Sequence, residues 1–370
     1  MRVVIAPDKF KGTLSANEVC LAIAQGIRDF DPSIEVVSHP LADGGEGTLD
    51  LLEDALNLKR IPLKVRDPLY REIKSYYLRN ETSAFIEMAL ASGLQLLRPE
   101  ERNPFETSTH GTGELIKHAI NNGARHIYLM IGGSATNDGG AGMAEALGFQ
   151  FQDERGRSSG MNGGNLGEIS DVLDKTDGLL AGVDFTVLTD VQNLLLGPDG
   201  ASFVYGRQKG ADDEMVVVLE QSLGMLKEIL NNGFENIAGA GAAGGLGYGA
   251  MSFLGAELKS GIETVMEITG FDTKLGGADL IISGEGKMDL QTVEGKVIAG
   301  VSKKARELEV PFSVICGIAE EVERVQASLQ AESIHPLVNE HVSPEMAMAN
   351  SFALVRERAY ELIMEFAQKN

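Results

Sequence analysis

The segment VVIAPDKFKGTLSANEVCLAIAQGIRDF, residues 3–30, decides the fold. Its β-branched start, Val3–Ala6, predicts a short buried strand. Ser15 with Glu18 three residues later is the signature of a helix capping box, and apolar residues then recur at helical spacing as far as Phe30. A strand, a loop and an amphipathic helix in this order open an α/β unit.

The same alternation returns further along the chain. A second strand and helix are predicted over residues 35–41 and 49–56. Near the other end, two strands over residues 279–283 and 311–316 flank a helix that starts near Val297. The fold class is therefore α/β, with an open, mostly parallel sheet built from both chain ends.

The middle of the chain is less regular and rich in glycine loops. We expect it to form a second α/β domain inserted into the first. The expected boundaries are residues 1–65 and 270–370 for the discontinuous domain, and residues 66–269 for the insertion.

Composition excludes several classes of protein. The 370 residues carry 54 acidic and 32 basic side chains, a net charge of -22, which is the wrong sign for nucleic acid or an anionic membrane surface. Cys20 and Cys316 are far apart and form neither a zinc motif nor a disulfide framework. No apolar run is long enough to span a membrane and no secretory signal is readable, so we expect a cytoplasmic protein without nucleic-acid or membrane partners.

Two glycine motifs bear on nucleotide binding. The Walker A pattern fails, because Gly286-Lys287 is followed by Met288 and Gly295-Lys296 by Val297. A G-x-G-x-x-G pattern occurs at residues 239–244, but a polar segment precedes it where a buried strand is needed. An NAD(P)-dependent hydroxy-acid oxidoreductase is the alternative function that this match leaves open.

A stronger signal is the stretch GGSATNDGG at residues 132–140, between a predicted strand and a predicted helix. Its glycines let a ligand approach the backbone, its hydroxyls can donate, and the helix N-terminus attracts anions. A turn that merely needs positive φ angles is the alternative. The candidate phosphate-binding residues are Gly132, Gly133, Ser134, Thr136 and Asn137.

Charged residues in loops add further candidates. Lys9 and Lys11 precede the first helix, where they oppose the helix dipole unless an anion shares the site; two solvated lysines are the alternative. Asp43 and Glu46 follow the second strand and could bind Mg²⁺ or accept a hydroxyl proton, with helix capping as the alternative.

Acids and lysines also follow two later strands. Gathered at the carboxyl ends of strands, such residues are suited to chemistry on a Mg²⁺-bound nucleotide. The segment GRQKG adds a basic loop. The histidines, His110 and His118 among them, lack the spacing of zinc ligands. The additional candidates are Asp190, Lys209, Gly284, Glu285, Gly286, Lys287, Asp289 and Lys296.

Together these motifs resemble the bacterial type I glycerate kinases, in order along nearly the whole chain. Two departures are visible: Lys9 stands where the family usually has serine, and Leu195 where it often has proline. The matching stretches are APDKFKGTLSA (6–16), ADGGEGT (42–48), STHGTGELI (108–116), IGGSATNDGGAGM (131–143), LTDVQNLLLG (188–197), YGRQKGA (205–211), GAGAAGGLGYG (239–249) and SGEGKMDLQTVEGK (283–296).

The resemblance implies transfer of the γ-phosphoryl group of ATP, with Mg²⁺, to D-glycerate in organic-acid catabolism. It favours 2-phosphoglycerate as the product and leaves 3-phosphoglycerate open. It also implies two α/β domains, one with a Rossmann or flavodoxin-like sheet, and an active site in the cleft between them. A homo-oligomer is compatible with the sequence.

Phosphoryl transfer needs alignment and neutralisation of charge more than covalent chemistry. We therefore expect Asp190 or Asp43 to be the base and Glu285 with Asp289 to lie nearest the metal. Lys296 or Lys11 is expected on a phosphate or on the glycerate carboxylate, and residues 132–136 around an anionic group.

Overall fold

The structure, a computed structural model, describes residues 1–45, 47–158, 160–293 and 296–369. The chain divides into unit 1, formed by Met1–Asp43 with Ser260–Asn370, and unit 2, formed by Gly44–Lys259. Separate clusters of buried apolar residues lie in each unit. No helix in the described part of the chain is long and apolar enough to cross a membrane.

Unit 1 is built on a five-stranded sheet in which all neighbouring strands run parallel. Numbered along the chain, its strands have the order 2-1-3-4-5 of flavodoxin-like folds, in which ligands bind where the strand order reverses. That switch point lies between β1 and β11. The strands are β1 (Arg2–Ile5), β2 (Glu35–Ser38), β11 (Leu280–Met288), β12 (Phe312–Ala319) and β13 (Ser333–Pro336).

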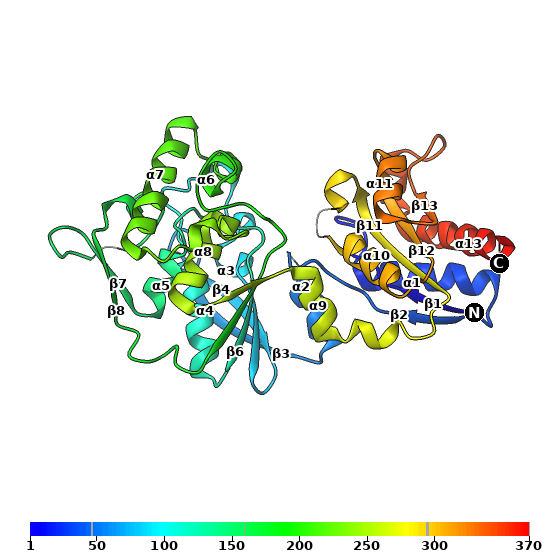
Figure 1. Cartoon of the computed structure of the whole chain (residues 1–370), viewed down its shortest axis with the longest axis horizontal. Helices are drawn as coiled ribbons and strands as arrows, with labels where there is room; N and C mark the ends of the chain where they lie inside the picture. Colours follow the sequence, from blue (N-terminus) through cyan, green and yellow to red (C-terminus); the bar gives the residue numbers. More distant parts are fainter. Residues whose placement is uncertain (46, 159, 294–295, 370) are drawn as a thin grey trace. The chain divides into compact units, whose positions relative to one another are not determined.

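Helices cover both faces of this sheet (Figure 1). Val3 and Ile5 pack against α1 and α13, while Val4 points to the opposite face, which α10 and α11 cover. All three side chains are fully buried, as the continuous apolar run predicts for a parallel strand. The helices are α1 (Ala16–Phe30), α9 (Gly261–Thr269), α10 (Val297–Glu307), α11 (Val322–Leu329), α12 (Pro344–Ala349) and α13 (Ser351–Lys369).

Unit 2 contains a six-stranded mixed sheet with the order β10-β9-β6-β5-β4-β3. The first four strands in this order are parallel, and β4 and β3 extend the sheet as an antiparallel hairpin. A separate hairpin joins β7 (Phe149–Gln152) to β8 (Asp171–Asp174). The sheet strands are β3 (Lys59–Arg66), β4 (Glu72–Arg79), β5 (Ser83–Glu87), β6 (His126–Met130), β9 (Asp184–Leu188) and β10 (Glu257–Lys259).

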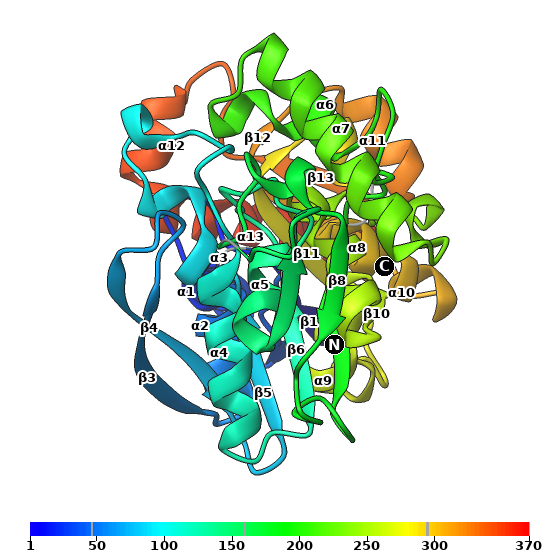
Figure 2. The same cartoon turned by 90° about the vertical axis from the view of Figure 1, so that its left-hand side faces the viewer.

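The helices of unit 2 pack around this sheet. α4 (His110–Asn121) and α5 (Ala141–Leu147) lie side by side on one face (Figure 2). The other helices are α2 (Thr48–Ala55), α3 (Ala89–Ser92), α6 (Ala201–Tyr205), α7 (Asp213–Leu230) and α8 (Ala242–Leu254).

Local signals predicted the elements well. The helix expected from Ser15 to Phe30 is α1, and its capping box is present: Ser15 Oγ accepts from the Glu18 amide, and the Glu18 carboxylate accepts from the Ser15 amide. The strand expected over residues 279–283 is longer than predicted, because residues 284–288 continue β11 by pairing with β12. The α/β class and the parallel sheet from both chain ends are confirmed.

The unit boundaries differ from the expected domain boundaries. Residues 44–65 belong to unit 2, because β3 pairs along its whole length with β4. Residues 260–269 belong to unit 1, where the Thr269 hydroxyl lies 2.9 Å from His39 Nε2. Strand pairing and side-chain contacts between distant segments decide both boundaries.

Two helix glycines, one in each unit, give a matched test of helix packing. A Cβ on Gly26 of α1 would lie 2.1 Å from the Arg356 carbonyl oxygen of α13, whereas a Cβ on Gly224 of α7 would meet nothing within 4 Å. Gly26→Ala should therefore lower the free energy of unfolding by about 1–3 kcal/mol through overpacking. Gly224→Ala should raise it by about 0.5–1 kcal/mol, because alanine favours helix. Urea denaturation measures both, and equal effects would contradict the close approach of α1 to α13.

Candidate functional site

The switch point of unit 1 brings the loop after β1 onto β11. The Asp8 amide donates to the Gly284 carbonyl at 2.8 Å. Gly286 allows the close approach, since a Cβ there would lie 3.2 Å from the Lys11 amide nitrogen. The loop that carries Asp8, Lys9 and Lys11 is therefore held against the segment that carries Glu285.

Carboxylates gather at this switch point. Burial raises the pKa of Asp8 to about 7, and repulsion from Asp43 and Glu285 acts in the same direction. Burial likewise raises the pKa of Glu285 to about 7, with Asp289 and Asp43 adding repulsion. The Thr292 hydroxyl donates to Glu285 and acts against this rise. At neutral pH, Asp8 and Glu285 are each near the midpoint of their titration.

The predicted lysines occupy different environments around these acids. Lys9 and Lys296 lower the pKa values of Asp8 and Glu285, respectively, by attraction. Lys11 is exposed in the loop after β1. Lys287 is also exposed, and its ammonium lies 3.2 Å from Asp289 and 3.1 Å from Glu320. Lys287 thus forms surface ion pairs, whereas Lys9 acts on Asp8 and Lys296 on Glu285.

The donor set suits one kind of metal site. Among the described residues, no three His, Cys, Asp or Glu side chains are arranged to hold a metal ion. Mg²⁺ does not need such a cage, because it commonly takes one or two carboxylates and completes its shell with water and phosphate oxygens. The carboxylates of Asp8 and Glu285, whose negative charge the surrounding protein neutralises only in part, fit that requirement.

Sequence reasoning missed two acids, the half-buried Asp8 and the buried Glu87. Asp8 stands directly after the first strand, and its place beside Lys9 and Lys11 was the available signal. Glu87 ends β5, is 3% exposed, and accepts a hydrogen bond from the Gly47 amide at 2.9 Å. A glutamate at the end of an apolar strand was its signal. Glu46, a candidate beside Asp43, lies outside the described residues.

In unit 2, the glycine loop follows β6 at the carboxyl edge of the parallel strands. Gly133 has φ +73° and lies on the surface, and its carbonyl accepts from the Leu94 amide at 2.9 Å. Within the described chain, the amides of Gly132 and Gly133 have no protein acceptor in hydrogen-bond geometry. These N–H groups, with Ser134 beside them, are placed to receive an anion.

The second half of the loop is inside the protein. Thr136, Asn137 and Asp138 are all 0% exposed, and Asn137 Nδ2 donates to Ser202 Oγ at 3.0 Å. The prediction placed Thr136 and Asn137 around a phosphate. In this structure protein surrounds both side chains, because α6 and the start of α8 pack over them.

The start of α5 is not open to a ligand, which corrects the expectation of a free helix N-terminus. The Asp138 carboxylate accepts from the amides of Gly140 and Gly142 at 3.2 and 3.3 Å. The amide of Ala141 donates to the Asp138 carbonyl, and that of Met143 to Thr109 Oγ1. The first-turn amides of α5 are thus satisfied within the protein.

Lys209 differs from the expectation of a loop lysine available to phosphate. It is 2% exposed, and its ammonium donates to the Thr136 carbonyl at 2.8 Å. Burial lowers its pKa to about 7, against the attraction of Asp138. The same burial raises the pKa of Asp138. Lys209 therefore contacts the glycine loop from its inner side.

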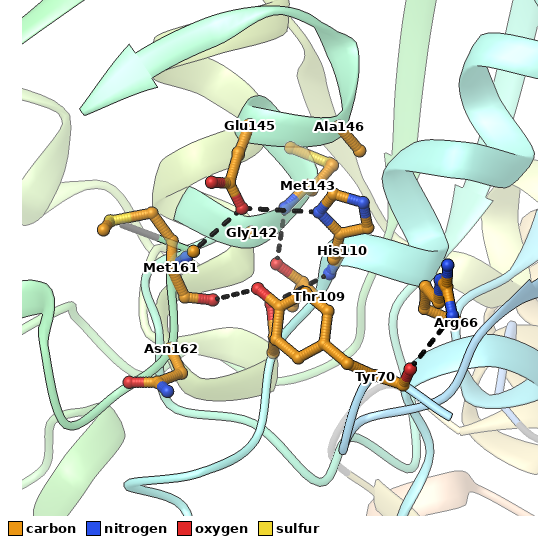
Figure 3. A network of polar contacts seen from close by, with 12 residues as sticks. Arg66, Tyr70, Thr109, His110, Gly142, Met143, Glu145, Ala146, Met161 and Asn162 are labelled. Carbon is orange, nitrogen blue, oxygen red and sulfur yellow. Dashed lines mark hydrogen bonds and ion pairs between the residues drawn. The ribbon is translucent and has the colours of Figure 1, made fainter. Parts of the chain in front are cut away.

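A second polar network joins α4 and α5 to a neighbouring loop (Figure 3). His110 Nδ1 lies 3.4 Å from Glu145 Oε2, which also accepts from the Met161 amide at 3.2 Å. The Tyr70 hydroxyl donates to the Met161 carbonyl at 2.9 Å and lies 3.1 Å from Ser108 Oγ. His110 is thus half-buried among protein partners.

Asp190 stands two positions beyond β9, at the same edge of the sheet as the glycine loop, because β9 pairs in parallel with β6. The following segment is anchored: Asn193 Nδ2 donates to the Asp199 carbonyl at 2.7 Å, and the Tyr205 hydroxyl donates to Asn193 Oδ1 at 2.6 Å. Leu195, where the resembled family often has proline, is fully buried in the core of unit 2.

The G-x-G-x-x-G match is explained by internal packing. A Cβ on Gly241 would lie 2.1 Å from the Leu194 carbonyl oxygen, and one on Gly244 would lie 2.0 Å from the Thr136 carbonyl oxygen. The element before the match is a short 3-10 helix, Phe234–Asn236, and no strand. This segment gives no support to a dinucleotide site.

Comparisons with known proteins agree on one family. A profile of the glycerate kinase family matches residues 3–367. The chain is 46% identical to a Bacillus cereus glycerate kinase over 86% of this chain and 85% of that protein. It is 43% identical to the Escherichia coli glycerate 2-kinase over 86% and 85%. A crystal structure described as a glycerate kinase 2 from Salmonella typhimurium superposes with a TM-score of 0.87 at 37% identity and covers 100% of both chains.

The raised pKa of Asp8 predicts a pH-dependent stability. Folded Asp8 binds a proton up to about pH 7, whereas the ordinary value is 3.8, so its contribution to stability is lost as the pH rises through 7. As the pH rises from 5 to 8, the free energy of unfolding of Asp8→Asn should increase by about 1–2 kcal/mol relative to that of the wild type. Urea denaturation without divalent cations measures this difference.

Asp29→Asn is the control for this prediction. Asp29 pairs with Arg356 on the surface of unit 1, and this partner lowers its pKa, so it stays ionised over the whole range. Its effect should be the same at each pH. If the Asp8→Asn and wild-type curves run parallel, Asp8 does not carry the proton assigned to it.

Proposed function

The chain belongs to the glycerate kinase family, and we propose that it transfers the γ-phosphoryl group of ATP to the 2-hydroxyl of D-glycerate. Kinase activity on glycerate follows from membership of this family, and the match over residues 3–367 is the observation that carries it. The 2-position is supported by the name of the Escherichia coli relative. The product is then 2-phosphoglycerate, with ADP released.

Unit 1 is proposed to hold Mg²⁺ through Glu285 and Asp289, with Asp8 and Asp43 close by. Mg²⁺ would neutralise charge on the ATP phosphates. The raised pKa values of Asp8 and Glu285 support this role, since a cation would compensate carboxylates that otherwise retain protons. Repulsion from Asp43 raises the pKa of both acids, so we assign Asp43 to the surroundings of the proposed metal ion.

The lysines of unit 1 are proposed to neutralise anionic groups of the ligands. Lys296 caps the start of α10 and interacts with Glu285, which suits a phosphate contact beside the metal. Lys9 and Lys11 lie in the loop after β1, which Gly284 and Gly286 allow to lie on β11. We assign Lys11, which matches the family motif, to a phosphate or to the glycerate carboxylate.

Unit 2 is proposed to bind an ATP phosphate through the amides of Gly132 and Gly133 and the Ser134 hydroxyl. The unpaired amides on a surface turn support this assignment. Asp190 is the proposed base, because it stands at the same sheet edge and is half-buried. Such a carboxylate would orient the attacking hydroxyl and accept its proton.

A reducing cytoplasm is the proposed location. The two cysteines, Cys20 and Cys316, are free and buried, and burial raises the pKa of each thiol. Inert thiols in an acidic chain suit that compartment.

The position of the new phosphate can be measured directly. Incubation of the protein with ATP, Mg²⁺ and D-glycerate should give the ³¹P resonance of 2-phosphoglycerate together with ADP. Omitting glycerate is the control and should leave ATP intact. A 3-phosphoglycerate resonance would overturn the proposed regiochemistry, and ATP left intact with glycerate present would overturn the proposed reaction.

The role of Asp190 is tested by comparing it with a second aspartate at the opposite end of β9. Asp190→Asn should lower kcat by about 10²- to 10⁴-fold, the usual contribution of a positioned base. Asp184→Asn at the start of β9 is the matched control, because Asp184 is exposed at the opposite end of the strand. Steady-state kinetics compare them, and near-normal turnover of Asp190→Asn would reject Asp190 as the base.

A further inference from the structure

Lys209 is a buried cation that no proposed ligand contact uses. It ends a short 3-10 helix, Arg207–Lys209, and is followed by Gly210 with φ +100°. A Cβ on Gly210 would lie 2.0 Å from the Arg102 carbonyl oxygen. The backbone around Lys209 is therefore held by close packing, and its side chain is directed into unit 2.

Burying the ammonium group of Lys209 costs free energy. Removing a charge from water is unfavourable, and an apolar side chain of similar volume often stabilises such a site as well or better. The lowered pKa of Lys209 reflects this cost. An ammonium group in this place therefore indicates a role for its hydrogen bond to the Thr136 carbonyl, which is 2.8 Å long.

The Thr136 carbonyl belongs to the segment that orients the surface turn. Just before it, the Ala135 amide donates to the Ser92 carbonyl, and the Ala135 carbonyl accepts from Thr107 Oγ1, both at 2.9 Å. Just after it, Asp138 is bonded to the starts of α4 and α5. Lys209 thus supplies the contact between these two anchors, at the Thr136 carbonyl, two residues after Ser134.

We propose that Lys209 is a positioning residue for phosphoryl transfer. Acting through the Thr136 carbonyl, it holds the backbone of Gly132–Ser134 in the conformation whose amides receive an ATP phosphate. This inference rests on the proposed function of that loop. Lys209 does not touch the ligand, and its effect is on nucleotide affinity.

The test compares Lys209→Met with Arg207→Met. Both variants remove a cation from one short helix, but the Arg207 side chain is 62% exposed and pairs with Asp213 on the surface. Lys209→Met should weaken ATP binding on the order of tenfold or more, because small misplacements of binding groups are costly. Its KM for glycerate should change much less, and its thermal midpoint should stay near that of the wild type.

Nucleotide affinity is measured by calorimetry with a non-hydrolysable ATP analogue, and KM values by kinetics. Arg207→Met should match the wild type in both. Wild-type ATP affinity in Lys209→Met, or a loss of thermal stability without a change in affinity, would overturn the inference. If Lys209→Met does not fold, Lys209→Gln replaces it with the same expectation, because its shorter amide does not reach as far.

The two proposals fail in different ways. A wild-type chain that binds the analogue but does not phosphorylate glycerate would overturn the proposed reaction, while the affinity comparison would still decide the role of Lys209. A wild-type chain that binds no nucleotide would overturn both.

Discussion

The architecture of unit 2 depends on one buried carboxylate, Asp138. It is fully enclosed and accepts from the Thr109 amide and hydroxyl at 2.7 and 2.8 Å and from two amides at the start of α5. A buried carboxylate is tolerated only when such donors surround it. Because its donors come from the starts of two helices and its backbone from the glycine loop, the three segments hold a common position.

This constraint determines how the loop can bind an anion. The amides at the start of α5, the usual place for a phosphate, are already used by Asp138 and Thr109. Among the described residues, the amides of Gly132 and Gly133 have no acceptor in hydrogen-bond geometry. The helix dipole therefore acts on a carboxylate of the protein, and the anion contact that we propose lies in the turn before the helix.

Sequence predicted what local interactions determine. The boundaries of α1 were found because a capping box and a helical apolar repeat are both contained in residues 15–30. The continuation of β11 through Met288 was missed because glycines suggest a loop, and only pairing with β12 makes this segment a strand. The assignment of residues 44–65 depended in the same way on the pairing of β3 with β4.

The candidate site follows the same rule. The glycine loop and Asp190 are candidates because each begins two positions beyond the end of a strand, where ligand-binding residues of α/β folds collect. The burial of Thr136, Asn137 and Lys209 could not be found, because it arises from α6 and α8 packing over the loop. Asp8 was overlooked because Glu285, whose charge raises its pKa, lies far away in the sequence.

The paired acids Asp8 and Glu285 have a consequence for proton exchange with the solvent. Since each retains a proton in a fraction of the molecules near pH 7, a cation that binds beside them would displace that proton. The cation binding that we propose at this switch point would then be an exchange reaction that acidifies the medium, with an apparent affinity that rises with pH. The number of protons released would then measure how much cation is bound to unit 1, whether or not a phosphoryl group is transferred.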